Sequence, residues 1–106
     1  MANIDWHGIE TQTATLAETL LKGYAKEATT DARAFQARAQ QQIAEWLEEL
    51  ANKEITQKNF ASLVRGERDL AEMRALKQAG LAQVALDTFT SGFMEIVLNA
   101  ALAALP

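Results

Sequence analysis

The segment Ala51-Asn52-Lys53-Glu54-Ile55-Thr56 is the clearest interruption in a sequence that otherwise shows helical periodicity. Apolar residues recur every three or four positions up to Leu50, and the same spacing resumes at Phe60. Asn52 tolerates the left-handed conformation that ends many helices, and Thr56 is suited to cap the helix that follows. We therefore predict two helices that meet at this turn and run antiparallel as a hairpin.

The composition favours an all-α protein. Ala, Leu, Glu, Gln, Lys and Arg, which are good helix formers, dominate the 106 residues, and the one proline is the terminal Pro106. Clusters of β-branched residues and turn dipeptides are few, so strands have little support. At this length we expect a single helical domain that spans residues 1–106.

The first half of the chain keeps one apolar stripe in phase from residue 20 to residue 50. The stripe crosses Thr29 and Thr30 without losing its spacing, whereas a loop at this point would normally shift the phase. We therefore predict one helix over residues 6–51, with a bend near Gly23 or Thr29. The alternative is two helices that meet near residue 30, with Thr30 as the N-cap of the second helix.

The second half poses the same question at Gly80, which is suited to end a helix in a left-handed conformation. No Ser, Thr, Asp or Asn occurs at residues 80–86 to cap a new helix. We therefore predict a continuous helix over residues 57–103, in which a glycine costs about 1 kcal/mol relative to alanine. The alternative is a second break near residue 80.

The end of the second predicted helix carries more apolar surface than one hairpin can cover. Residues 81–106 contain no Lys or Arg, and Asp87 and Glu95 are their only charged residues. A helix that is apolar on all sides is buried on all sides or lies in a membrane. We therefore predict a homo-oligomer, with a dimer favoured, in which two hairpins form a four-helix bundle. The predicted oligomer interface consists of Leu86, Phe89, Phe93, Ile96 and Val97.

This prediction depends on the continuity of the two long helices. If the chain breaks near residues 30 and 80, its four shorter helices would instead close as a monomeric four-helix bundle.

Charge and cysteine content exclude several function classes. The net charge of −4 argues against binding to nucleic acid, which requires a basic surface. The chain has no Cys, which excludes disulfides, thiolate chemistry and cysteine-based zinc sites. The first residues lack a basic segment followed by an apolar one, so we expect no cleaved signal peptide and a cytoplasmic protein.

Residue types that carry catalysis or metal binding are scarce. His7 is the only histidine, and no Glu-x-x-His motif of the di-iron type occurs. Glu45, Glu48 and Glu49 are interpreted as a solvated helix face rather than a cation site. We therefore expect no enzyme activity, no catalytic residue, no cofactor and no metal.

Asp87 and Glu95 stand out because their neighbours in the sequence are apolar. Either residue would pair with Lys22 or Lys26 of the antiparallel helix, or both would point outward into solvent; the sequence leaves both interpretations open.

A second charged stretch lies early in the same predicted helix. Arg65 and Asp69, and likewise Arg68 and Glu72, are spaced i,i+4, which is typical of ion pairs on an exposed helix face.

Residues 88–106 have nearly the length of a membrane span, but Glu95 near their middle would cost about 2.5–3.5 kcal/mol on insertion. We therefore favour a non-enzymatic assembly or adaptor protein that acts through self-association and contacts with an unidentified protein partner. The first alternative is a membrane-active or secreted helical hairpin that uses residues 81–106. The second is carboxylate-based binding of a metal or ligand within a helical bundle.

Overall fold

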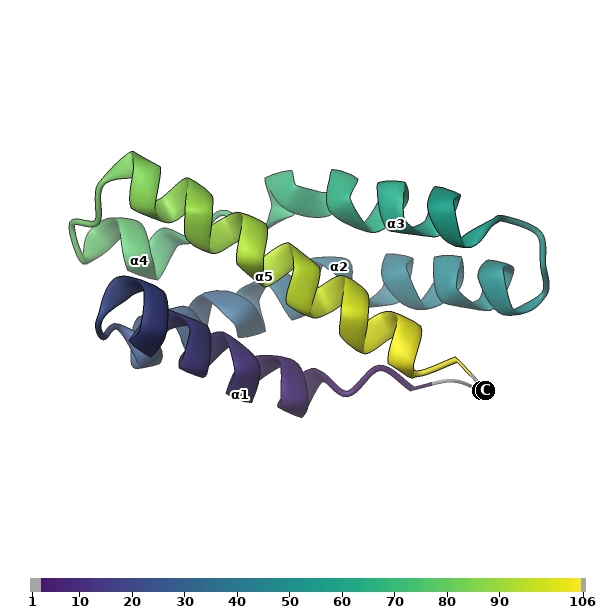
Figure 1. Ribbon diagram of the computed structural model, residues 1–106, viewed down its shortest axis with the longest axis horizontal. Helices are drawn as coiled ribbons and strands as arrows, with labels where there is room; N and C mark the ends of the chain where they lie inside the picture. Colours follow the sequence, from purple (N-terminus) through teal and green to yellow (C-terminus); the bar gives the residue numbers. More distant parts are fainter. Residues whose placement is uncertain (1–2, 106) are drawn as a thin grey trace.

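The computed structural model describes residues 3–105, and helices dominate it (Figure 1). No strand occurs among these residues, so the prediction of an all-α protein is confirmed. A π-helical turn, η1, continues α1, and a 3₁₀ turn, η2, continues α3. The elements are α1 (Trp6–Leu16), η1 (Ala17–Leu21), α2 (Ala25–Ala51), α3 (Gln57–Gly66), η2 (Glu67–Leu70), α4 (Arg74–Gln78) and α5 (Gln83–Ala103).

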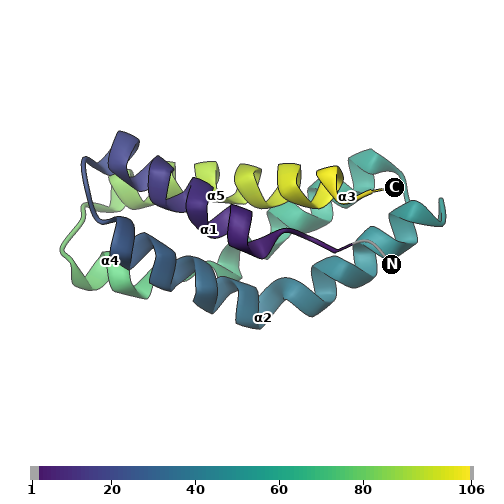
Figure 2. The same cartoon turned by 90° about the horizontal axis from the view of Figure 1, so that it is seen from below.

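The elements run along the long axis of the molecule, which measures 43 Å against 21 Å in each of the other two directions. α1 packs antiparallel to α2, and α5 packs between α1 and α3 (Figure 1). α3 and α4 follow one another along the opposite side of α2. Figure 2 shows α1 and α5 together in one layer, with α2 and α4 in the layer below.

The turn between α2 and α3 lies where the sequence predicts it. Thr56 is the N-cap of α3: its hydroxyl accepts a hydrogen bond from the Asn59 N–H at 3.0 Å, and the Asn59 side chain accepts from the Thr56 N–H at 3.2 Å. This reciprocal pair satisfies two backbone donors that the helix itself cannot. The left-handed residue is Lys53, with φ of +62°, and not Asn52 as predicted.

The prediction of one helix over residues 6–51 is wrong, because the chain turns at residues 22–24. Lys22, Gly23 and Tyr24 all have positive φ, at 60°, 142° and 68°. The stripe residues at this turn, Leu20 and Tyr24, are exposed and lie outside the core, so their spacing matched the stripe of α2 without marking one continuous helix face. Periodicity therefore did not reveal the break.

The alternative break near residue 30 is also wrong, because α2 is continuous there. The hydroxyls of Thr29 and Thr30 donate to the carbonyls of Ala25 and Lys26, one turn earlier. These bonds satisfy both hydroxyls inside the helix, so neither acts as an N-cap.

The prediction of a continuous helix over residues 57–103 is wrong, and the alternative break near residue 80 is confirmed. α4 ends at Gln78, Gly80 has φ of +89°, and α5 begins at Gln83. α5 begins after Ala82, whose side chain cannot cap it, so the missing cap residue did not indicate continuity.

A further break, at residues 67–73, was not predicted. α3 gives way to η2, and Met73 then has φ of +53° before α4 begins. The first N–H groups of α4 donate to Asp31 of α2, a partner more than 40 residues away in the sequence. A local reading of the sequence cannot detect such a cap.

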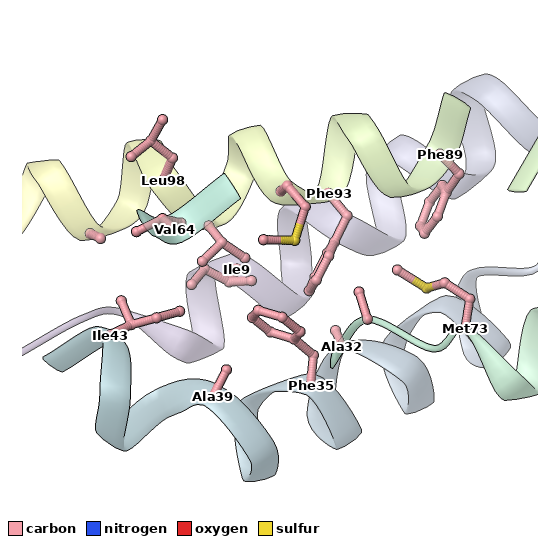
Figure 3. Packing of buried hydrophobic residues seen from close by; sticks show 14 of the residues in the cluster. Ile9, Ala32, Phe35, Ala39, Ile43, Val64, Met73, Phe89, Phe93 and Leu98 are labelled. Carbon is pink, nitrogen blue, oxygen red and sulfur yellow. The ribbon is translucent and has the colours of Figure 1, made fainter. Parts of the chain in front are cut away.

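The core lies between the two layers and draws on all the longer helices (Figure 3). Phe35 of α2 and Phe93 of α5 meet edge to face with their ring centroids 5.1 Å apart. The ring of Trp6 lies 6.3 Å from that of Phe35 on the α1 side. Such aromatic pairs contribute about 0.5–1.5 kcal/mol beyond their area burial.

Candidate functional site

Basic residues are distributed unevenly over the molecule. All ten Lys and Arg residues lie between Lys22 and Lys77, so α1 and α5 contain none. These two helices pack side by side (Figure 2). We call their outward side the α1–α5 face. Neither helix supplies a basic side chain to it, although Arg65 of α3 and Arg68 of η2 reach α5 from the side. Its exposed residues include Thr11, Thr15, Leu20, Val84, Thr88 and Asn99.

Two of the most exposed apolar side chains lie at one end of the α1–α5 face. Leu20 of η1 is 42% exposed and Val84 in the first turn of α5 is 78% exposed. η1 packs beside α5, and both residues belong to segments at the same end of the molecule (Figure 1). Tyr24, in the adjacent turn, is also exposed. This end therefore presents apolar surface to solvent.

The threonines of the face have hydroxyls that are already satisfied. Thr11, Thr15 and Thr88 donate to backbone carbonyls one turn earlier in their own helices, at 3.2, 3.1 and 3.0 Å. Covering a hydroxyl that keeps its hydrogen bond avoids the cost of an unsatisfied polar group. Their methyl groups remain available for apolar contact, so the face is less polar than its composition indicates.

A glycine sets the close approach of α1 and α5. A Cβ placed on Gly92 would lie 2.9 Å from Cδ2 of Leu16, closer than carbon atoms normally approach. The absence of a side chain at residue 92 therefore lets α5 pack directly against the Leu16 side chain, and it keeps the two helices of the face together.

The predicted oligomer-interface residues are mostly inside the protomer. Phe89, Phe93 and Val97 are fully buried, and Leu86 is 4% exposed. Ile96 is half-buried. The premise that a single chain cannot cover this helix is wrong, because α1, α2 and α3 all pack against α5. Self-association stays a prediction, and Pro106, the last residue of the predicted segment, lies outside the described residues.

Glu95 pairs with Arg65 of α3 and not with a lysine. Two hydrogen bonds of 2.9 Å join the guanidinium to the two carboxylate oxygens. The hydrogen bonds from Arg65 hold the pKa of Glu95 below its ordinary value, against a smaller opposing effect of desolvation. The same contact raises the pKa of Arg65.

Asp87 is exposed, as the second interpretation predicted, and its carboxylate accepts from the Gln83 side-chain amide at 2.8 Å. Within residues 3–105 neither Asp87 nor Glu95 forms an ion pair with Lys22 or Lys26.

The predicted i,i+4 ion pairs are not formed, because α3 ends at Gly66 and the following 3₁₀ turn changes the spacing. Arg68 instead donates to the Ser91 hydroxyl at 2.7 Å and to the Asp87 carbonyl at 2.9 Å. Glu72 lies 2.7 Å from the Arg74 guanidinium. The arginines of this region therefore connect η2 and α3 to α5.

The surface hollows formed by residues 3–105 include two with distinct linings. One, of about 340 Å³, lies between the N-terminal segment and α2, and its lining is apolar and amide-rich: Asn3, Ile4, Trp6, Gln40, Gln41 and Ala44. The other, of about 230 Å³, lies between η2, α4 and α5. Arg68, Lys77, Asp69, Glu72 and Asp87 contribute charges of both signs to its lining. This mixture favours no single ligand charge.

The residues considered for metal binding lie apart. His7 is exposed in the first turn of α1, whereas Glu45 and Glu48 are exposed near the end of α2, with Glu49 half-buried beside them. Within residues 3–105 no three histidine or acidic side chains are grouped to hold a metal ion.

The length and apolarity needed to cross a membrane are not combined in any helix of the described chain. Comparison with family models, curated proteins and solved structures gives no match. Function is therefore inferred from the geometry of the chain.

Proposed function

We propose that the chain is a non-enzymatic helical assembly protein that acts by self-association, with a dimer as its basic unit, and by contacts with protein partners. The observation that carries this proposal is the α1–α5 face, where two adjacent helices lack basic residues and expose Leu20 and Val84. The cores of protein–protein interfaces are depleted of charged residues, and lysine is among the residues that they disfavour most.

The acids near this face support the same proposal. Glu95, which shares the outward side of α5 with Val84 and Thr88, is paired with Arg65, and Glu10 is paired with Arg33 at 3.0 Å, so both carboxylates have partners within the chain. A nucleic acid or an anionic lipid surface would require free cationic contacts, whereas the arginines that reach α5 are engaged by Glu95, Ser91 and the Asp87 carbonyl. A protein surface of low charge fits it best.

Light scattering coupled to size exclusion, in the absence of detergent, tests the proposal. We expect a mass near twice the 11.6 kDa of one chain at high protein concentration, decreasing toward 11.6 kDa on dilution. Circular dichroism on the same samples would show whether the helix content stays constant. A mass of 11.6 kDa at every concentration would contradict self-association.

A further inference from the structure

We infer that two copies of the chain exchange α1 and η1, because residues 22–24 form a hinge that straightens to join α1 and α2 into one helix. In the exchanged dimer, α1 of each copy packs on α2 and α5 of the other copy, with the same contacts that it makes within a single chain. This inference rests on the proposed self-association and adds the way in which the two copies are joined.

The turn at residues 22–24 is strained and weakly bonded. Lys22 and Tyr24 have φ of 60° and 68°, in the left-handed region that side chains disfavour. The Gly23 N–H donates to the Ala17 carbonyl at 3.5 Å, which is a long hydrogen bond. No side chain caps the start of α2. The turn is therefore held by the packing of α1 rather than by bonds of its own.

Two other turns of the chain are fixed by side chains. Thr56 and Asn59 form the reciprocal cap of α3, and Asp31 accepts from the first N–H groups of α4. Short hinge loops under strain are where proteins exchange an element between copies. Residues 22–24 fit this description, and they connect α1 and η1 to the helices on which α1 packs.

A straightened hinge would bring two exposed apolar side chains into contact with a second copy. Leu20 and Tyr24 are 42% and 39% exposed, and they lie at helical spacing between the buried residues Ala17 and Ala28. Because α1 packs antiparallel to α2 (Figure 1), the two long helices of an exchanged dimer run antiparallel through their hinges. Leu20 and Tyr24 of one copy then meet the same residues of the other, and the single chain offers them no such cover.

The ion pair between Glu10 and Arg33 marks which copy α1 packs on. It joins α1 to α2 at 3.0 Å within one chain, whereas in the exchanged dimer its two residues belong to different copies. The chain has no Cys, so Glu10→Cys combined with Arg33→Cys provides the only two thiols, which a short bis-maleimide can link. Arg65→Cys combined with Glu95→Cys is the matched control, because this pair joins α3 to α5 and stays within one copy.

Cross-linking of separated monomer and dimer tests the exchange. Each protein is refolded at high concentration, the two species are separated by size exclusion, and both are cross-linked and run on a denaturing gel. In the dimer fraction, the cross-link between residues 10 and 33 should give a band at twice the 11.6 kDa of one chain. In the monomer fraction it should give a band at 11.6 kDa, as the control should in both fractions.

Substitutions in the hinge test the cause of the exchange. Gly23→Ala places a side chain at φ of +142°, which strains the turn and favours the straight helix. Since each dimer straightens two hinges, its dissociation constant should fall at least about tenfold. Lys22→Gly relieves the turn and should raise the dissociation constant. Gly66→Ala is the matched control, because a Cβ meets no atom within 4 Å at either glycine, and it should change nothing.

Sedimentation equilibrium measures the dissociation constants, and thermal melts confirm that each variant is folded. A dimer whose cross-links between residues 10 and 33 all stay at the mass of one chain overturns the exchange and leaves self-association standing. A dissociation constant that Gly23→Ala leaves unchanged or raises, while Lys22→Gly does not raise it, overturns the hinge and the inference with it. A parent chain that is monomeric at every concentration overturns both proposals.

Discussion

Asp31 belongs to α2, but its side chain caps the start of α4. Its carboxylate accepts from the N–H groups of Ala75 at 2.9 Å and Leu76 at 3.0 Å, and only 5% of the residue is exposed. α4 is five residues long, and its own N-cap, Met73, forms no side-chain cap. A helix this short is not stable alone, so Asp31 fixes where it begins.

Replacing Asp31 with alanine should lower the free energy of unfolding by about 2–3 kcal/mol, because two N–H groups would lose a charged acceptor. Urea unfolding measures the loss, and hydrogen exchange at Ala75 and Leu76 should accelerate more than exchange in α5. Thr30→Ala, at the exposed neighbouring position, should change stability much less. Unchanged exchange at the two α4 amides would show that the cap contributes little.

Substitution by alanine should have opposite effects on stability at Gly23 and at Gly66. A Cβ would meet no atom within 4 Å at either Gly23 or Gly66, so space does not distinguish them. Gly23 has φ of +142°, a backbone conformation that residues with a side chain rarely adopt, whereas Gly66 has φ of −65°. Gly23→Ala should destabilise the protein by about 1–3 kcal/mol, and Gly66→Ala should stabilise it by about 0.4–1 kcal/mol. Denaturant midpoints measure both variants, and a change in stability of the same sign in both would contradict these expected effects.

At the scale of elements, the Arg65–Glu95 pair joins α3 to α5 and should respond to acid. The pKa of Glu95 is lowered in the folded chain, so the pair contributes fully above the unfolded pKa of about 4.3. That contribution is lost as the pH falls through the lowered folded pKa. Glu95→Gln should therefore melt below the parent chain at neutral pH, with the gap closing in acid.

The size of this effect should be small, because both side chains are about half exposed and water screens their attraction. Gln12→Glu, on the exposed side of α1, supplies a control for general charge effects. A gap in melting temperature that stays constant from neutral pH to pH 2 would contradict the linkage.

Element boundaries show what local sequence can and cannot specify. The turn after Ala51 was predictable because Thr56 and Asn59 build their cap from residues three apart. The start of α4 was not, because its cap comes from Asp31 of α2. The start of α5 has no side-chain cap to detect. The continuous apolar spacing across residues 22–24 misled because it depended on Leu20 and Tyr24, which are apolar but exposed in the structure.

At the scale of the whole molecule, the sequence predicted the α5 part of the candidate site but not the α1 part. The scarcity of charge after residue 81 was evident, and it predicted an interface on α5. The packing of α1 beside α5 was not evident, because the turn at residues 22–24 was missed. That turn explains both outcomes: it lets α1 cover Phe93 and its neighbours, and it joins two helices without basic residues into one face.

The salt dependence of the dimer follows from this arrangement. An interface between two α1–α5 faces would form few ion pairs between copies, because Arg65 and Glu95 are already paired within one chain. Raising the salt concentration should therefore leave the dissociation constant unchanged or slightly lower. The competing arrangement places Glu18 and Asp87 of one copy against the lysines at residues 22, 26 and 77 of another. Salt would screen those pairs and weaken the dimer. Sedimentation equilibrium from low to high sodium chloride therefore distinguishes the two arrangements, since only the lysine-based one should dissociate as salt rises.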